Sequence, residues 1–335
     1  MNKRLIWADS LKGWLIILVV LGHAIQNTIG AGCDDNHLWN LIYSFHMPAF
    51  MAISGYLAFR TRINGRENVK PLYLVIYRRF RQLIIPFVIW TIVLLLIGGN
   101  PSLEKMGLYL LYPDKGLWFL WVLFFITVFF NIGDWLSKCL HIKQELVILV
   151  LCLLFAGSMV LFEIRVLGFQ FIAYYFIIYS LGYYLHKYYD KIVISNSFVI
   201  GIMIICWGVL AWFWKMHDLP NYLKALPFPT TLVQYAYRFI TAALAIYILF
   251  TVSPKLMDTN SKWNVPFINL GRISLGIYTV HFILIGRVVS LCRGFISNDN
   301  LMILLSFVMA LLMSWLVVWL LNKWSFTAKW LLGKI

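Results

Sequence analysis

Three histidines lie inside apolar segments of the chain, where ionisable side chains are uncommon. His23, His46 and His281 are each flanked by hydrophobic residues and fall at comparable depths of their segments. Because a polar group in hydrocarbon costs free energy, such residues are candidates for function. Imidazole gains and loses protons near neutral pH, which suits general acid–base or nucleophilic catalysis. Each histidine alone could simply hydrogen-bond a neighbouring helix, whereas three at one depth favour a shared polar cavity.

Two charged residues stand near the start of the first apolar segment. Lys12 precedes His23 by eleven positions, so at about 100° per residue the two share one helix face, about 16 Å apart along the axis. Asp9 lies three residues before Lys12 and could pair with it or cap the helix N-terminus. We expect Asp9 to do both; a catalytic role is the alternative.

A basic cluster runs from Arg60 to Arg81 and ends in a group of arginines. Arg78 and Arg81 are three residues apart and share a helix face, with Arg79 between them. Arginine pairs with phosphate oxygens through two parallel hydrogen bonds, so these residues could hold a phosphorylated cofactor. The alternative is ordinary cytosolic positive charge beside anionic lipid. The sequence has no glycine-rich phosphate loop of the Walker or Rossmann kind.

Neither the histidines nor the cysteines show the spacing of a metal site. None of the three histidines belongs to an HxxxH or HExxH pattern, so we expect no metal. The five cysteines form no CxxC pair, and most should be small apolar fillers. Cys33 and Cys292 both fall in predicted outer loops, which leaves a disulfide between them open.

The elements that must position these residues are membrane-spanning helices. The chain of 335 residues is 62% hydrophobic and only 12% charged, which excludes an ordinary soluble domain. We predict an all-α polytopic bundle in which residues 1–335 form a single domain. Its ten predicted spans have the length that a tilted helix needs to cross a bilayer; they are 8–29, 38–59, 79–98, 117–133, 145–162, 171–187, 197–214, 233–251, 271–290 and 301–321.

Charge placement sets the predicted orientation. The net charge of +15 could indicate nucleic-acid binding, but the basic residues sit in short loops between apolar spans. Most of them fall on one side when the N-terminus is inside, so both termini should be cytoplasmic. No small-residue cleavage site follows the N-terminal apolar run, so we expect no cleaved signal peptide. The tail after Asn322 is basic and aromatic, as in segments that lie on the inner leaflet.

The order of these motifs resembles the acyltransferase family 3 membrane proteins. That family includes O-antigen, exopolysaccharide and peptidoglycan O-acetyltransferases and the fucose 4-O-acetylase-like proteins. The matching elements are Lys12 to His23, Phe45 to Tyr56, Leu117 to Leu120, Tyr179 to Tyr183, the pair Arg78 and Arg81 followed by Pro86, and the late set Gly271, Ser274, Ile277, Tyr278 and His281. Many members carry arginine where this chain has Lys12. The lysine ammonium has the same charge but lacks the two parallel N–H donors of a guanidinium. We expect no fused esterase-like domain.

The resemblance implies transfer of an acyl group, usually acetyl, from cytosolic acetyl-CoA to a hydroxyl of an extracytoplasmic glycan or glycolipid. The protein would be a multi-pass component of the cytoplasmic membrane that modifies cell-envelope polysaccharide, in contact with membrane lipid and with no nucleic acid. Whether it forms a homo-oligomer is open. The implied roles are as follows: catalysis by His23, Lys12 and Asp9; acetyl-CoA binding by Arg78, Arg81 and Arg79; a substrate cavity lined by His46, Ser54, Tyr278 and His281; and no metal.

Two other functions fit the same residues. A transporter or flippase would also place polar groups in mid-membrane, but it predicts inverted repeats or paired broken helices, which the sequence does not show. A scaffold or sensor of an envelope-assembly complex would use the histidines structurally.

Overall fold

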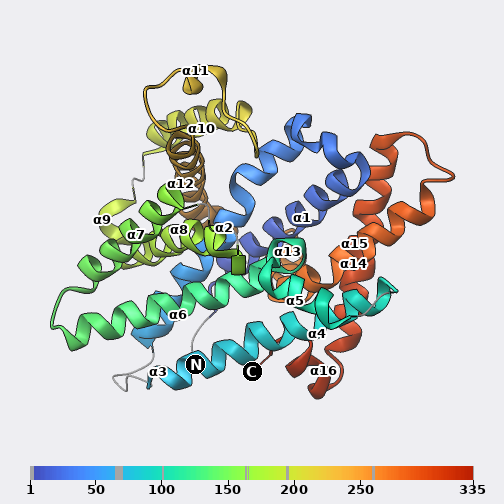
Figure 1. The fold of residues 1–335 in the computed structure, drawn as a ribbon, viewed down its shortest axis with the longest axis horizontal. Coiled ribbons are helices and arrows are strands. Elements are labelled where there is room, and N and C mark those ends of the chain that lie inside the picture. The colour runs from blue at the N-terminus through green and yellow to red at the C-terminus, as the bar shows by residue number, and fades with distance from the viewer. Residues whose placement is uncertain are drawn as a thin grey trace. The chain divides into compact units, whose positions relative to one another are not determined.

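The computed structural model describes residues 4–64, 71–99, 102–162, 164, 166–193, 196–258 and 261–334. Within these ranges every regular element is a helix, as the ribbon shows (Figure 1). Nine of the described helical segments are long and apolar enough to cross a membrane. The predicted all-α polytopic class is therefore confirmed, and the chain is a multi-pass membrane protein. Residues 65–70 of the predicted basic cluster lie outside the described part.

The predicted spans overlap helices of the structure, although bounds differ by up to seven residues, as where the helical run of the predicted span 79–98 begins at Leu72. Two differences affect the description of the spans most. The predicted span 197–214 is α10 (Ser197–Trp212), whose 16 residues are apolar but short for a full crossing. The predicted span 271–290 starts too early. Gly271 and Arg272 end a separate short helix, α13 (Val265–Arg272), and α14 (Ser274–Cys292) begins after Ile273.

The chain divides into two compact units, each built from two stretches. Unit 1 comprises Met1–Ser54 and Tyr184–Val318, and unit 2 comprises Gly55–Tyr183 and Trp319–Ile335. Unit 1 contains α1 (Ile6–Ile29), η1 (Gly30–Asp35), the first part of α2 (His37–Asn64), α9 (Tyr189–Ile192), α10, α11 (Asn221–Lys224), α12 (Thr230–Met257), α13, α14 and most of α15 (Asp299–Leu321). The prediction of one domain stays a prediction.

In unit 1, α1 packs extensively against α13 and also contacts α14 and α12. Two glycines let the backbones of α1 and α13 touch. A Cβ built on Gly271 would lie 1.7 Å from the backbone oxygen of Asp9, and one on Gly13 would lie 2.0 Å from that of Phe267. Beside them, the rings of Trp14 and Phe267 stack with centroids 4.1 Å apart. Small residues allow this close approach between membrane helices.

Two side-chain contacts join η1 to the loop after α10 in unit 1. His217 Nδ1 lies 2.6 Å from Asp34 Oδ2, and Lys215 Nζ lies 3.0 Å from Asp35 Oδ1. The Asp35 carboxylate raises the pKa of the Lys215 ammonium above its ordinary value. These exposed pairs hold η1, which continues α1, against the loop after α10.

In unit 2, a continuous helical run carries the arginines. It consists of α3 (Leu72–Arg79), the π-helical turn η2 (Phe80–Ile84) and α4 (Ile85–Ile97). Proline cannot donate a backbone hydrogen bond, and the wider turn ends at Ile84, two residues before Pro86. The rest of the unit is the last part of α2, α5 (Leu103–Leu111), η3 (Pro113–Lys115), α6 (Trp118–Cys139), α7 (Gln144–Leu161), η4 (Val166–Gly168), most of α8 (Phe169–Lys187), the end of α15 and α16 (Ser325–Trp330).

Candidate active site

The three predicted histidines lie in one cluster of rings within unit 1. Each comes from a different helix: His23 from α1, His46 from α2 and His281 from α14. The rings of His23 and His281 are in contact, with centroids 5.2 Å apart. His46 is linked to His23 through Tyr43, whose ring centroid lies 4.8 Å from that of His46 and 6.4 Å from that of His23. The structure thus brings the three histidines into one cluster, and the prediction that they share a polar substrate cavity stays a prediction.

Backbone contacts fix the proton positions on two of the rings. His46 Nδ1 lies 2.6 Å from the Ile42 carbonyl oxygen, and His281 Nδ1 lies 3.0 Å from that of Ile277. A carbonyl oxygen only accepts hydrogen bonds, so each Nδ1 must carry the proton. In the neutral form, each Nε2 then has a free lone pair. Both rings are thus held as acceptors that face away from their own helix.

Two buried ring nitrogens of the cluster lack a protein partner. Among the described residues, neither His23 Nδ1 nor His281 Nε2 has a hydrogen-bond partner. Buried polar atoms are nearly always satisfied, so an exception calls for a reason. A bound hydroxyl compound or a reacting group between the two rings would supply the missing partner.

Sequence reasoning did not find two further polar members of this cluster. Tyr43 donates from its hydroxyl to Gln26 Oε1 at 3.0 Å, and Gln26 interacts with the His23 side chain. Gln26 follows His23 by three residues and Tyr43 precedes His46 by three, so each shares a helix face with a histidine. That spacing was the signal in the sequence that could have revealed them.

Tyr278 and Ser54, the two other residues predicted to line the substrate cavity, lie at different distances from the histidine rings. Tyr278 is buried, and its ring centroid is 5.7 Å from that of His281. Ser54 lies eight residues beyond His46, about 12 Å along α2. Its hydroxyl donates to the Phe50 carbonyl oxygen of the same helix at 2.9 Å. The structure thus places Tyr278 in the histidine cluster and Ser54 two turns away from His46.

Asp9 and Lys12 form the expected pair, but Asp9 does not cap the helix. Lys12 Nζ lies 2.7 Å from Asp9 Oδ1, and Arg272 Nε and Arg4 Nε approach Asp9 Oδ2 at 3.8 and 4.0 Å. The helix begins at Ile6, and its N-cap Leu5 makes no side-chain cap bond. The capping prediction is wrong because the start is earlier than expected, which puts Asp9 inside the helix. Its carboxylate, which is buried, instead joins α1 to α13.

Removing the charge of Asp9 should lower stability because Lys12 would lose its partner. We expect Asp9→Asn to reduce the free energy of unfolding by about 1–3 kcal/mol, as for a hydrogen bond to a charged group. Adding Lys12→Met should recover part of that loss, because no uncompensated charge then remains. The measurement is thermal unfolding in detergent of the two single variants and the double variant. Strictly additive losses would show that the two side chains are not coupled.

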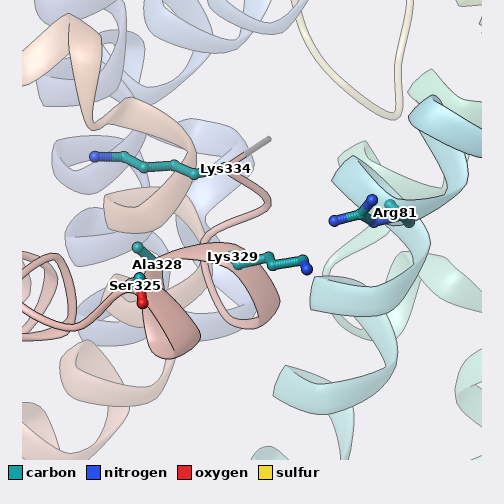
Figure 2. Close-up of a pocket in the computed structure, with 5 residues that line it drawn as sticks. All are labelled: Arg81, Ser325, Ala328, Lys329 and Lys334. Atoms are coloured by element: carbon teal, nitrogen blue, oxygen red, sulfur yellow. The ribbon is translucent and has the colours of Figure 1, made fainter.

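The three predicted arginines have different surroundings in unit 2. Arg78 is exposed, and Arg79 Nη1 donates to Gln82 Oε1 at 3.0 Å. Arg81 alone of the three lines a described cavity of about 410 Å³. The other lining residues come from the C-terminal segment and are Ser325, Ala328, Lys329 and Lys334 (Figure 2).

The structure shows no cross-link or metal cluster in its described part. All five cysteines, Cys33 and Cys292 included, are free thiols. No group of three or more histidine, cysteine or acidic side chains among the described residues is placed to hold a metal ion.

Comparison with known proteins identifies the family. Residues 5–321 match the family described as an acyltransferase domain. The chain is 35% identical to nodulation protein NolL of Sinorhizobium fredii over 167 residues, 44% of this chain and 42% of that protein. It is 34% identical to nodulation protein NolL of Mesorhizobium japonicum over 151 residues, 40% of this chain and 39% of that protein. The chain thus spans about two fifths of the length of these curated relatives, and no solved structure matches it significantly. Because the family match covers nearly the whole chain and includes every motif described above, the protein belongs to the acyltransferase 3 family.

Proposed function

We propose that the protein is a membrane-bound O-acyltransferase. It takes an acyl group, acetyl in the first instance, from a cytosolic acyl-CoA and transfers it to a hydroxyl of an extracytoplasmic glycan or glycolipid. Its place is the cytoplasmic membrane, with both termini inside. The observation that carries the proposal is the contact between the rings of His281, which is buried, and His23, which is partly buried. Each ring has a buried nitrogen with no hydrogen-bond partner among the described residues.

His23 is the proposed general base. It removes the proton from the acceptor hydroxyl while that oxygen attacks the thioester carbonyl; the new C–O bond forms, the C–S bond breaks and the proton passes to the departing thiolate. In the covalent variant, His23 itself takes the acyl group from sulfur and then passes it to the hydroxyl. The lone pair of His281 Nε2 can accept a hydrogen bond from the His23 ring and orient it.

Two sets of cations have separate proposed roles. Lys12 would orient the donor or stabilise developing negative charge, although its ammonium is already paired with Asp9. Arg81, with Arg78 and Arg79 beside it, would bind the phosphates of CoA. His46, Tyr278 and Ser54 would line the acceptor path.

Donor binding tests the proposal. Purified protein in detergent should be stabilised by acetyl-CoA, by about 2.7 kcal/mol at a hundredfold excess over Kd. S-Acetyl-N-acetylcysteamine, which has the thioester but no phosphate, should stabilise it far less. Arg81→Gln should weaken the acetyl-CoA effect, whereas the matched control Lys255→Gln, an exposed cation on α12, should leave it unchanged. A protein that acetyl-CoA and CoA both fail to stabilise would be a transporter or a scaffold instead.

A further inference from the structure

The C-terminal segment is fixed on the helix that carries the arginines. Trp90, which is buried on α4, donates from Nε1 to the Leu331 carbonyl oxygen at 2.8 Å. Leu332 and Ala328 are buried as well. These contacts lie within unit 2 and join residues about 240 positions apart in sequence. The segment 325–334 is therefore an ordered part of this unit.

A glycine brings the end of this segment against the residue next to Arg81. Gly333 has a φ of +63°, a conformation that favours glycine. A Cβ at this position would lie 2.2 Å from the Gln82 backbone oxygen. Beyond it, the Lys334 backbone N–H donates to the Ala328 carbonyl oxygen at 3.1 Å and folds the end back onto α16. Gly333 thus fixes the position of the Lys334 backbone beside Gln82.

This arrangement gathers cations around one cavity. The cavity of about 410 Å³ is lined by Arg81, Lys329 and Lys334, together with Ser325 and Ala328, and none of these described lining side chains is acidic. Lys329 extends from α16 toward Arg81 (Figure 2). The Arg81 guanidinium lies 6.0 Å from the Trp330 ring centroid, an aromatic contact that leaves its charge uncompensated. None of the three cations takes part in an ion pair with another described residue.

We propose that residues 325–334 complete a phosphate-binding pocket, in which Lys329 and Lys334 act together with Arg81. Like charges around one cavity repel each other, and a multivalent anion removes that repulsion. The Ser325 hydroxyl adds a neutral donor, and the volume is within the range of small-ligand sites. This inference rests on the proposed function and extends it: the phosphate belongs to the acyl-CoA donor, and the C-terminal segment supplies two of the three cations that line the cavity.

The test compares CoA binding by charge-neutralised variants of the full chain. The protein is placed in nanodiscs of phosphatidylcholine, and the Kd of CoA is measured for Lys329→Gln, Lys334→Gln, the double variant and Arg81→Gln. Each charge-assisted contact should contribute about tenfold, so each single lysine variant should raise the Kd by about tenfold and the double variant by about a hundredfold. Lys323→Gln is the matched control, since Lys323 precedes the segment and lies over the Trp319 ring at 3.9 Å. It should leave the Kd unchanged.

Two further arms test the docking and the source of the phosphate. Gly333→Ala should raise the Kd as the double variant does, because it displaces the segment from Gln82 while all three cations remain. If the acyl-CoA donor is the ligand, the protein in nanodiscs that contain phosphatidylglycerol should bind CoA with nearly the same Kd as in phosphatidylcholine alone. If phosphatidylglycerol instead raises the Kd of CoA strongly, and does not do so in the double variant, the pocket binds phosphate but its natural ligand is a lipid headgroup.

The results that would overturn the inference differ from those that would overturn the proposed function. If Arg81→Gln weakens CoA binding and the double lysine variant does not, the C-terminal segment has no part in the site, while the acyltransferase proposal stands. If CoA does not bind the unaltered protein, the proposed function itself fails.

Discussion

Replacing His23 with glutamine is expected to reduce acyl transfer by about 100-fold or more, the range of a lost general base. Glutamine has similar length and keeps a hydrogen-bonding group beside Gln26, so α1 should remain in place. It cannot take a proton from an acceptor hydroxyl and it cannot carry an acyl group. The loss should therefore appear in kcat, with little change in the stability of the purified protein.

The measurement is release of free CoA thiol from acetyl-CoA in membranes that contain the acceptor. His37→Gln is the matched control, because His37 is exposed at the start of α2 and stacks on Trp212 outside the cluster. Its activity should equal that of the unaltered protein. Full activity of the His23 variant would remove the proposed base.

His281 offers a comparison that separates the two rings. Its Nδ1 is held by Ile277, so it can orient His23 through Nε2 without leaving its own helix. His281→Asn should then reduce the rate less than His23→Gln does. The double variant should be no slower than the His23 variant, because residues that act as a unit are not additive. The reverse order of the single effects would make His281 the base.

The sequence predicted the long apolar helices well, for a simple reason. Hydrophobic runs of bilayer length have few alternatives to a spanning helix, and a histidine within such a run has a depth set by its position. This argument brought His23, His46 and His281 to one level. Which rings touch depends on how α1, α2 and α14 rotate and pack, and the role of Tyr43 as the link therefore became visible only in the structure.

The predictions from sequence failed where a short helix, a helix end or a contact between distant residues decides the structure. The eight residues of α13 are too few to stand out as a span, so Gly271 was assigned to the following helix. The first helix begins at Ile6, which turned a predicted cap at Asp9 into an interior carboxylate. Arg81 was found from its neighbour Arg78, but Lys329 and Lys334 join it through the fold alone, and no local pattern connects them.

The close contact between α1 and α13 leads to the largest expected change in stability. The motif that includes Gly271 resembles a family signature, and the structure gives a packing reason for the glycine. The backbone oxygen of Asp9 occupies the space of a side chain at position 271, at 1.7 Å from an ideal Cβ. Since a backbone atom cannot rotate away, α13 would have to move as a whole.

We expect Gly271→Ala to destabilise the protein by about 3 kcal/mol or more, the upper range for overpacking, because the whole interface must separate. Movement of α13 would also draw Arg272 away from Asp9 and unstack Phe267 from Trp14. Gly13→Ala, which meets the Phe267 backbone oxygen at 2.0 Å, should have a similar effect. The measurement is thermal unfolding in detergent together with the yield of folded protein.

Gly208→Ala is the control for this prediction. Gly208 lies within α10, and a Cβ there would meet nothing within 4 Å in the described structure. Alanine at that position should be neutral or stabilising by up to about 1 kcal/mol, since glycine is a poor helix former. If Gly271→Ala unfolds at the temperature of the Gly208 variant, α1 and α13 cannot be in backbone contact. In that case α13 would not be the helix that buries the Asp9 carboxylate. The structure would then give no reason for the buried position of the Asp9–Lys12 pair.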